Sequence, residues 1–271
     1  MLKDHKLILV FLSLVYVEVY ALKLDRVILA SNSNPNYLEF WPVVAKTWKR
    51  VIGVQPTLAL IDDTGIIIDE SLGDVIRVPS IEGVPTWFQA QVVRLFLPIL
   101  FPEDVCILSD MDLVPLNRRF FTDGIEDLPE NSFLVYNNNA NQDRFPICYL
   151  AAKGRVFAEV FNAQGVKSVD DVNQLIKYWF ETFLPFFGWD TDERVFHRYI
   201  TQWDGYAQRC CLLNRFDGQR RIDRSSKMNF DLNKLRSSYY YDMHLPRPYF
   251  KCRDMIDDIL NHLGADRLSN N

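Results

Sequence analysis

The sequence predicts an α/β protein with a mixed, mostly parallel central β-sheet flanked by helices. Short apolar runs rich in β-branched residues alternate with longer segments whose apolar residues recur at helical spacing. This alternation is typical of βαβ units, in which helices connect parallel strands. A second observation is an Asp-Met-Asp triplet at residues 110–112, just after the apolar run 105–108. Because buried carboxylates are costly, the triplet is expected at the end of a buried strand.

The composition is that of a globular chain. Its 271 residues are 48% hydrophobic and 24% charged, which suits one large domain. The net charge of -5 argues against a nucleic-acid partner, because such proteins usually present a basic face. The five cysteines have no CxxC spacing, which argues against a zinc site or a disulfide framework. Cys106 is interpreted as a small buried hydrophobe.

Residues 1–21 form a separate segment. It has a short basic start, an apolar stretch at 7–17, and small residues Val19 and Ala21 placed as at a cleavage site. These features predict a secretory signal peptide or a short membrane anchor, and the apolar stretch is short for a spanning helix. We therefore expect the secretory pathway lumen or membrane association through the N-terminus. The alternatives are an apolar element packed on the domain and a cytoplasmic protein.

The first part of the chain alternates regularly. Strands are expected at 26–30, 56–63, 74–80 and 105–108, with helices at 36–53 and 85–100. Ligands on parallel sheets bind beyond the carboxyl ends of the strands. Residues 31–34, 62–63 and 110–112 should therefore meet at one edge of the sheet.

The second part of the chain is less regular. The patterns predict strands within 131–139 and 144–153, helices at 154–162, 169–187 and 192–203, and a short amphipathic helix near the C-terminus. The sequence contains no internal repeat. We expect a single domain, with residues 22–121 and 122–271 as two functional halves.

Asp110 and Asp112 form the first candidate site. Carboxylates one residue step apart suit a hard divalent cation that also bridges substrate phosphates. The same triplet fits an ordinary strand-to-loop turn, in which an aspartate caps a backbone amide. Its place at a sheet edge favours the metal interpretation.

The stretch RLFLPILFPEDVCILSDMDLVPLNRRFF, residues 94–121, resembles the DxD region of GT-A fold glycosyltransferases. Upstream, VILASNSN and LALIDD lie where that fold contacts the nucleotide base and ribose. Downstream, FFGWDTDERVF resembles the acidic segment near the acceptor, and DMHLPRPY resembles the C-terminal His and Pro-Lys-Pro segment of glycogenin-like members. The resemblance covers most of residues 25–250. It implies a Rossmann-like GT-A fold, with a nucleotide-sugar half at 22–121 and an acceptor half at 122–271.

The resemblance also implies a metal site. Asp112 would bind Mn²⁺ or Mg²⁺ directly, Asp110 would contact the metal or the ribose, and His244 would complete the protein ligands. The sugar diphosphate would supply the remaining ligands. Without the resemblance, an ordinary surface or turn histidine is the better interpretation of His244.

Further residues would bind the substrates. The donor implied is a nucleotide sugar linked to UDP or GDP, and the acceptor implied is a glycan or glycoconjugate. Arg94 would face the nucleotide or diphosphate, and Arg247 stands where the family places a phosphate-binding lysine. The other substrate-binding positions expected on the donor side are Ser31, Asn32, Asp62 and Ser109.

An acidic cluster at 190–193 supplies candidates for the catalytic base, which takes the proton of the acceptor hydroxyl. We rank Asp192 first, Asp190 second and Glu193 third. Acidic residues in the first turn of a helix also stabilise it through the helix dipole, whether or not they have a catalytic role. Trp189 could stack on the acceptor sugar or belong to the core. The Thr-Asp-Glu pattern departs from the Asp-Gln of glycogenin-like retaining enzymes, so both stereochemical outcomes remain open.

Three alternatives share these features. A haloacid dehalogenase-like phosphatase would use Asp110 as nucleophile, but its motif normally ends the first strand, and it needs a later lysine and acidic pair. Lys153 or Lys167 with Asp170 and Asp171 are the candidates. A nucleotidyltransferase would want a glycine-rich basic loop, which ASNSNPN lacks. The third alternative is a non-catalytic binding module with a transferase-like fold.

Overall fold

The computed structural model describes residues 22–137, 143–226 and 228–263. The expected signal or anchor segment, residues 1–21, lies outside the described residues. In the described ranges, no helix combines the length and the apolar character that crossing a bilayer requires.

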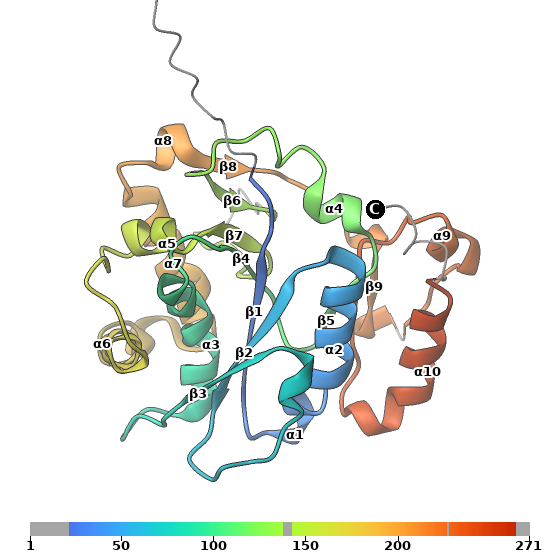
Figure 1. Cartoon of the computed structure of the whole chain (residues 1–271), viewed down its shortest axis with the longest axis horizontal. Helices are drawn as coiled ribbons and strands as arrows, with labels where there is room; N and C mark the ends of the chain where they lie inside the picture. The colour runs from blue at the N-terminus through green and yellow to red at the C-terminus, as the bar shows by residue number, and fades with distance from the viewer. Residues whose placement is uncertain (1–21, 138–142, 227, 264–271) are drawn as a thin grey trace, which may run out of the picture.

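Seven strands form the main sheet, in the order β3-β2-β1-β4-β7-β6-β8 (Figure 1). The first four are parallel: β3 (Asp74–Val78), β2 (Gln55–Ile61), β1 (Arg26–Asn32) and β4 (Val105–Leu108). The antiparallel pairings are those of β7 (Leu150–Lys153) with β4 and with β6 (Phe133–Val135), and β8 (Cys210–Leu212) is parallel to β6. The predicted mixed, mostly parallel sheet is confirmed.

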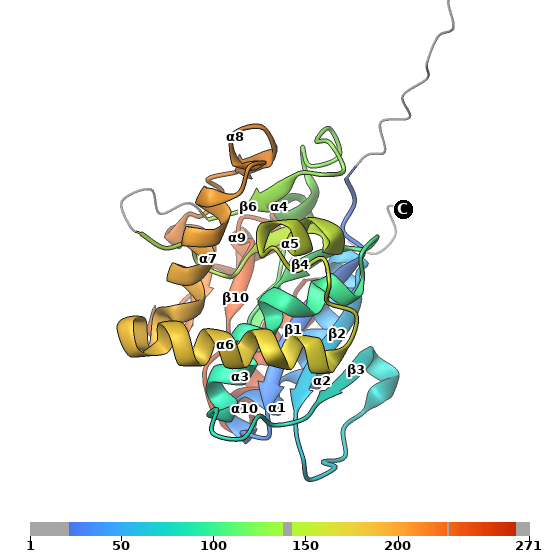
Figure 2. The ribbon, with the colours of Figure 1, turned by 90° about the vertical axis from the view of Figure 1, so that its left-hand side faces the viewer.

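Both faces of this sheet are covered. In β4, Val105 and Ile107 face one hydrophobic cluster, while Cys106 and Leu108 face the other. This two-sided burial explains why the central strands are apolar without alternation. One face packs against α3 (Thr86–Phe96), α5 (Gly154–Val160), α6 (Val169–Phe187) and α7 (Thr191–Gln202), and the other against α2 (Trp41–Thr47) and α10 (Tyr249–Asn261) (Figures 1 and 2).

A second, three-stranded sheet was not predicted. It contains β5 (Leu113–Pro115), β10 (Asp242–His244) and β9 (Arg221–Asp223), with β10 in the middle. β5 begins directly after Asp112, and its Leu113 pairs with His244 of β10. The backbone N–H of Leu245 also donates to the carbonyl of Asp112 at 2.7 Å. The small sheet therefore joins the C-terminal segment to the acidic triplet.

Several expected elements differ in extent. The helix expected at 36–53 is three pieces, α1 (Pro35–Leu38), α2 and the wide turn η1 (Trp48–Ile52), because Pro42 supplies no backbone donor and begins a new helix. It ends as predicted at Gly53, whose φ is 87°. The strands expected at 131–139 and 144–153 shrink to β6 and β7. The helices expected at 154–162, 169–187 and 192–203 are present as α5, α6 and α7.

Short elements complete the chain. They are η2 (Glu70–Leu72), η3 (Leu97–Leu100), α4 (Arg118–Thr122), η4 (Gly188–Asp190), α8 (Tyr206–Arg209), η5 (Gly218–Arg220), η6 (Arg224–Ser226) and α9 (Leu232–Arg236). Of these, η3 extends α3 over the predicted range 85–100. η4 and η6 carry residues to the site described below.

The junction of β7 and α5 at Gly154 tests this packing. A Cβ at Gly154 would overlap the carbonyl oxygens of Pro98 and Phe101 in the turn that leads to β4. We expect Gly154→Ala to lower the free energy of unfolding by about 2 kcal/mol, because a packed backbone must shift. Gly165→Ala, where no atom lies within 4 Å of the added carbon, should change it little. Urea denaturation measures both, and equal stability of the two variants would contradict this packing.

Candidate functional site

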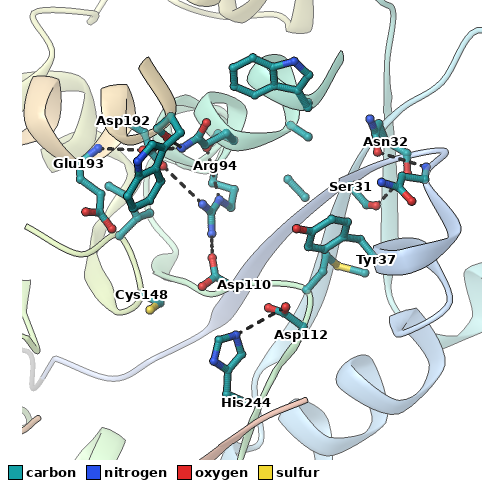
Figure 3. Close-up of a pocket in the computed structure, with 18 of the residues that line it drawn as sticks. Ser31, Asn32, Tyr37, Arg94, Asp110, Asp112, Cys148, Asp192, Glu193 and His244 are labelled. Atoms are coloured by element: carbon teal, nitrogen blue, oxygen red, sulfur yellow. Dashed lines mark hydrogen bonds and ion pairs between the residues drawn. The ribbon is translucent and has the colours of Figure 1, made fainter. Parts of the chain in front are cut away.

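A cavity of about 430 Å³ lies at the carboxyl ends of β1 and β4, the edge that the sequence predicted (Figure 3). Its volume is in the range of ligand-binding sites. Residues from distant parts of the chain line it together. Those expected from the sequence are Ser31, Asn32, Arg94, Asp110, Asp112, Trp189, Asp192, Glu193 and His244.

Asp112 is the centre of one end of the cavity. Its side chain is only 5% exposed. Arg224 donates a hydrogen bond to its carboxylate, and Nε of Arg247 and Nε2 of His244 lie 3.5 and 3.6 Å from Oδ2. Burial raises the pKa of Asp112, but the hydrogen bond to His244 and the two arginine charges outweigh burial and lower the pKa below its ordinary value. Asp112 is therefore an anion surrounded by cationic and imidazole groups.

Asp112 and His244 fit a divalent cation as a pair. Nδ1 of His244 lies 3.2 Å from Oδ2 of Asp223, which leaves Nε2 facing Asp112 (Figure 3). A carboxylate behind a histidine ring is the usual support for a metal-binding imidazole. Within the part of the chain that the structure describes, no group of three or more His, Cys, Asp or Glu is placed to hold a metal ion. A cation here would need further ligands, such as diphosphate oxygens.

Arg94 lies between the two ends of the cavity. It comes from the last turn of α3 and is nearly buried. Its Nη1 donates to the carboxylate of Asp110 and to the carbonyl of Ser109 at 3.3 Å, and its Nη2 lies 3.6 Å from Oδ2 of Asp192 (Figure 3). A buried guanidinium requires such anionic partners. Arg94 thus fixes Asp110 relative to Asp192.

The other end of the cavity is acidic. The side chain of Asp192 is 3% exposed, and its Oδ1 accepts hydrogen bonds from Nε2 of Gln91 at 2.7 Å and from the backbone N–H of Glu193 at 2.9 Å. Burial raises the pKa of Asp192 to about 7, although the charge of Arg94 opposes the shift. Burial likewise raises the pKa of Glu193 to about 7, against the charge of Arg144. Carboxyl groups of this pKa can exchange protons near neutral pH.

Asp190, the second candidate base, lies outside the cavity lining. Its Oδ2 accepts hydrogen bonds from Nε of Arg194 at 2.8 Å and from Nη1 of Arg144 at 3.2 Å. It is the last residue of η4 and directly precedes the first residue of α7. This contact pattern is that of a residue that holds the 188–194 segment in place.

Three expected substrate-binding residues also lie outside the lining. The carboxylate of Asp62 accepts hydrogen bonds from the backbone N–H groups of Thr64 and Ile66 at 2.9 and 2.7 Å and organises its own loop. Ser109 is buried beneath Arg94. Arg247 does not line the cavity but contacts two residues that do: it pairs with Asp112 and donates a hydrogen bond to the hydroxyl of Tyr37.

The residues nominated for the phosphatase alternative do not meet at the cavity. Lys153 pairs in register with Val105 at the start of β4, the opposite end from Asp110, and its Nζ donates to Glu130. Asp171 forms the capping box of α6 with Ser168, and Asp170 lies in the same helical turn, far from a strand end. Lys167 lies beside this cap, where its backbone N–H donates to Asp171. None of the residues that line the cavity among those described is a lysine.

Several lining residues were missed from the sequence, and four of them have aromatic, amide or guanidinium side chains. Trp87 and Gln91 share one face of α3 with Arg94, at i, i+4 and i+7, and this spacing was a usable signal. Tyr37 follows the polar loop after β1, which was also a usable signal. Arg224 comes from the irregular region after Asp204, and no local pattern points to it.

Comparisons with known proteins bear on the fold. No protein-family model matches the sequence, and no curated protein matches it. Among solved structures, the glycosyltransferase GlyE of Streptococcus pneumoniae TIGR4 has a TM-score of 0.50 at 14% identity, with 90% of this chain and 61% of GlyE covered. The galactosyltransferase LgtC, solved with donor and acceptor sugar analogs, has a TM-score of 0.49 at 11% identity, with 91% of this chain and 97% of LgtC covered.

The protein has the GT-A fold. The likeness to GlyE and the mixed, mostly parallel sheet of seven strands both show this class. The chain spans 61% of the length of GlyE. At 14% identity the likeness concerns the fold, so inferences about activity rest on the residues of the cavity.

The raised pKa of Asp192 predicts an effect on stability. In the unfolded chain this carboxyl group ionises near pH 4, whereas in the folded protein it stays protonated up to about pH 7. Between these values the folded state holds one more proton, so the free energy of unfolding falls as the pH rises from about 4 to about 7. Asp192→Asn removes this cost. We expect its gain in free energy of unfolding to be larger near pH 8 than near pH 5, by on the order of 2 kcal/mol. Denaturation at both pH values measures the difference, and an equal gain would refute the raised pKa.

Proposed function

We propose that this protein is a metal-dependent glycosyltransferase that moves a sugar from a nucleotide diphosphate to a hydroxyl group of a glycan or glycoconjugate. One observation carries the proposal. A single cavity holds the Asp112 cluster with its cations at one end, and the buried Asp192 and partly buried Glu193, both with a raised pKa, at the other. A sugar transfer needs both functions, stabilisation of a diphosphate leaving group and removal of a proton.

The Asp112 end is assigned to the diphosphate of a UDP-linked or GDP-linked sugar. Arg224 lines the cavity and can bind phosphate oxygens through charge-assisted hydrogen bonds. A divalent cation held by Asp112 and His244 would neutralise charge on the diphosphate as it leaves. Arg247 adds positive charge behind Asp112, at 3.5 Å.

The Asp192 end is assigned to the acceptor. In the transfer, the bond between the anomeric carbon and the diphosphate oxygen breaks, the acceptor oxygen bonds to that carbon, and the hydroxyl proton passes to a carboxylate. Asp192 is the preferred base because it lines the cavity and its pKa is about 7. Glu193 shares both properties and becomes the second candidate in place of Asp190.

Asp112→Asn tests the proposal. A panel of UDP-linked and GDP-linked sugars is incubated with Mn²⁺, and the nucleoside diphosphate released is measured. We expect at least one donor to be turned over, and the substitution to reduce its turnover at least about 100-fold, because the ion loses its anionic ligand.

Asp123→Asn is the matched control, since Asp123 is exposed and pairs with Arg119 away from the cavity. It should leave turnover unchanged. If the wild-type protein binds the nucleotides but turns over no donor, the non-catalytic binding module is the better account. Unaltered turnover in Asp112→Asn would sink the metal assignment.

Arg224 tests the diphosphate assignment separately. Arg224→Ala should raise the KM for the donor roughly 10- to 100-fold, the effect of losing a charge-assisted hydrogen bond to phosphate. Arg224→Lys should recover part of the loss. Arg220→Ala is the control, because Nε of Arg220 donates to the carbonyl of Tyr239 outside the cavity. Steady-state kinetics at varied donor concentration distinguish the variants, and an unchanged KM in Arg224→Ala would remove this residue from the donor site.

A further inference from the structure

Two tryptophans at the cavity are exposed. Trp87 is 49% and Trp189 is 70% exposed, and both line the cavity. By contrast, Trp41, Trp48 and Trp179 are fully buried. Because an indole ring is a large apolar surface, such exposure beside a ligand-sized cavity marks rings that the protein covers only in part.

The two tryptophans belong to one surface. Trp87 lies in the first turn of α3, and Gln91 follows one turn later on the same helix face. Nε2 of Gln91 donates hydrogen bonds to the carbonyl of Trp189 and to Oδ1 of Asp192. Gln91 therefore connects the helix face of Trp87 to Trp189 and to the candidate base.

The polar groups near the two tryptophans are amide, hydroxyl, carboxyl and guanidinium groups. Asn32 donates to the hydroxyl of Thr86 at 3.0 Å, next to Trp87 in the sequence, and Glu193 lines the cavity together with Trp189. The guanidinium of Arg144 lies 5.7 Å from the ring centroid of Trp189. The surface thus combines flat apolar faces with amide, hydroxyl and carboxyl groups.

We propose that Trp87 and Trp189 form the binding subsite for a pyranose ring of the acceptor. A pyranose has an apolar C–H face that stacks on an indole ring, and a rim of hydroxyl groups that hydrogen-bond to amides and carboxylates. A lipid chain would not use the polar groups, and a phosphorylated acceptor would be repelled by Asp192 and Glu193. The subsite rests on the proposed function, because it positions a sugar hydroxyl next to the base Asp192.

Binding experiments on the full chain test the subsite without catalysis. Saturation-transfer NMR is recorded with lactose, maltose, cellobiose and a serine-containing peptide, with UDP and Mn²⁺ present and absent. We expect at least one of the sugars to bind at millimolar concentration. Trp87→Ala and Trp189→Ala should each weaken its binding at least about fivefold, and Trp189→Phe should retain most of it, because a phenyl ring still stacks.

Phe186→Ala is the matched control. Phe186 is 79% exposed on α6 and does not line the cavity, so its loss should not change sugar binding. Circular dichroism of every variant checks that the fold is retained. The subsite is wrong if no sugar of the panel binds, if the peptide alone binds, or if the two tryptophan variants bind sugar as the wild type does.

The subsite and the proposed function can fail separately. Release of nucleoside diphosphate from a donor without any acceptor reports on the donor end alone. Donor cleavage together with sugar binding that ignores both tryptophans would overturn only the subsite. Sugar binding that depends on both tryptophans, with no donor cleaved by any variant, would overturn only the transferase.

Discussion

The site depends on the buried guanidinium of Arg94. It is held between the carboxylates of Asp110 and Asp192, one after the central strand β4 and the other at the start of α7. Breaking a buried ion pair by removing one partner typically costs several kcal/mol, because a charge is left without compensation. This contact is one of several ion pairs that hold residues 22–121 against residues 122–271, together with those of Asp112 with Arg224 and Arg247. Through Asp110 and Asp192, the same contact joins the two ends of the cavity.

The charge of the cavity changes along its length. Near Asp112, two arginines and a histidine surround one carboxylate, so this end of the cavity has positive charge that a further anion can balance. Near Asp192, burial is the strongest influence and raises the pKa of Asp192 and of Glu193 to about 7. A diphosphate suits the first environment and a neutral hydroxyl the second. This difference in environment, more than any single residue, distinguishes the two ends of the cavity.

The central strands and the position of the acidic triplet could be predicted from the sequence, because both depend on local residue patterns. The run 105–108 predicted a buried strand, and the strand placed Asp110 and Asp112 at the sheet edge, where the structure has them. The small sheet was not predictable, because three-residue strands such as β9 carry no periodic signal. Arg224 follows that strand and was missed with it. Asp62 was expected at the cavity because β2 ends there, but its short polar loop binds the carboxylate instead.

The most direct test of the account is nucleotide binding with and without metal. Thermal unfolding is followed in the presence of UDP, GDP or ADP, each with and without Mn²⁺. The account predicts that UDP or GDP raises the Tm only when Mn²⁺ is present, since ion and diphosphate complete one site together. Stabilisation of equal size without the ion, or none by any nucleotide, would contradict it.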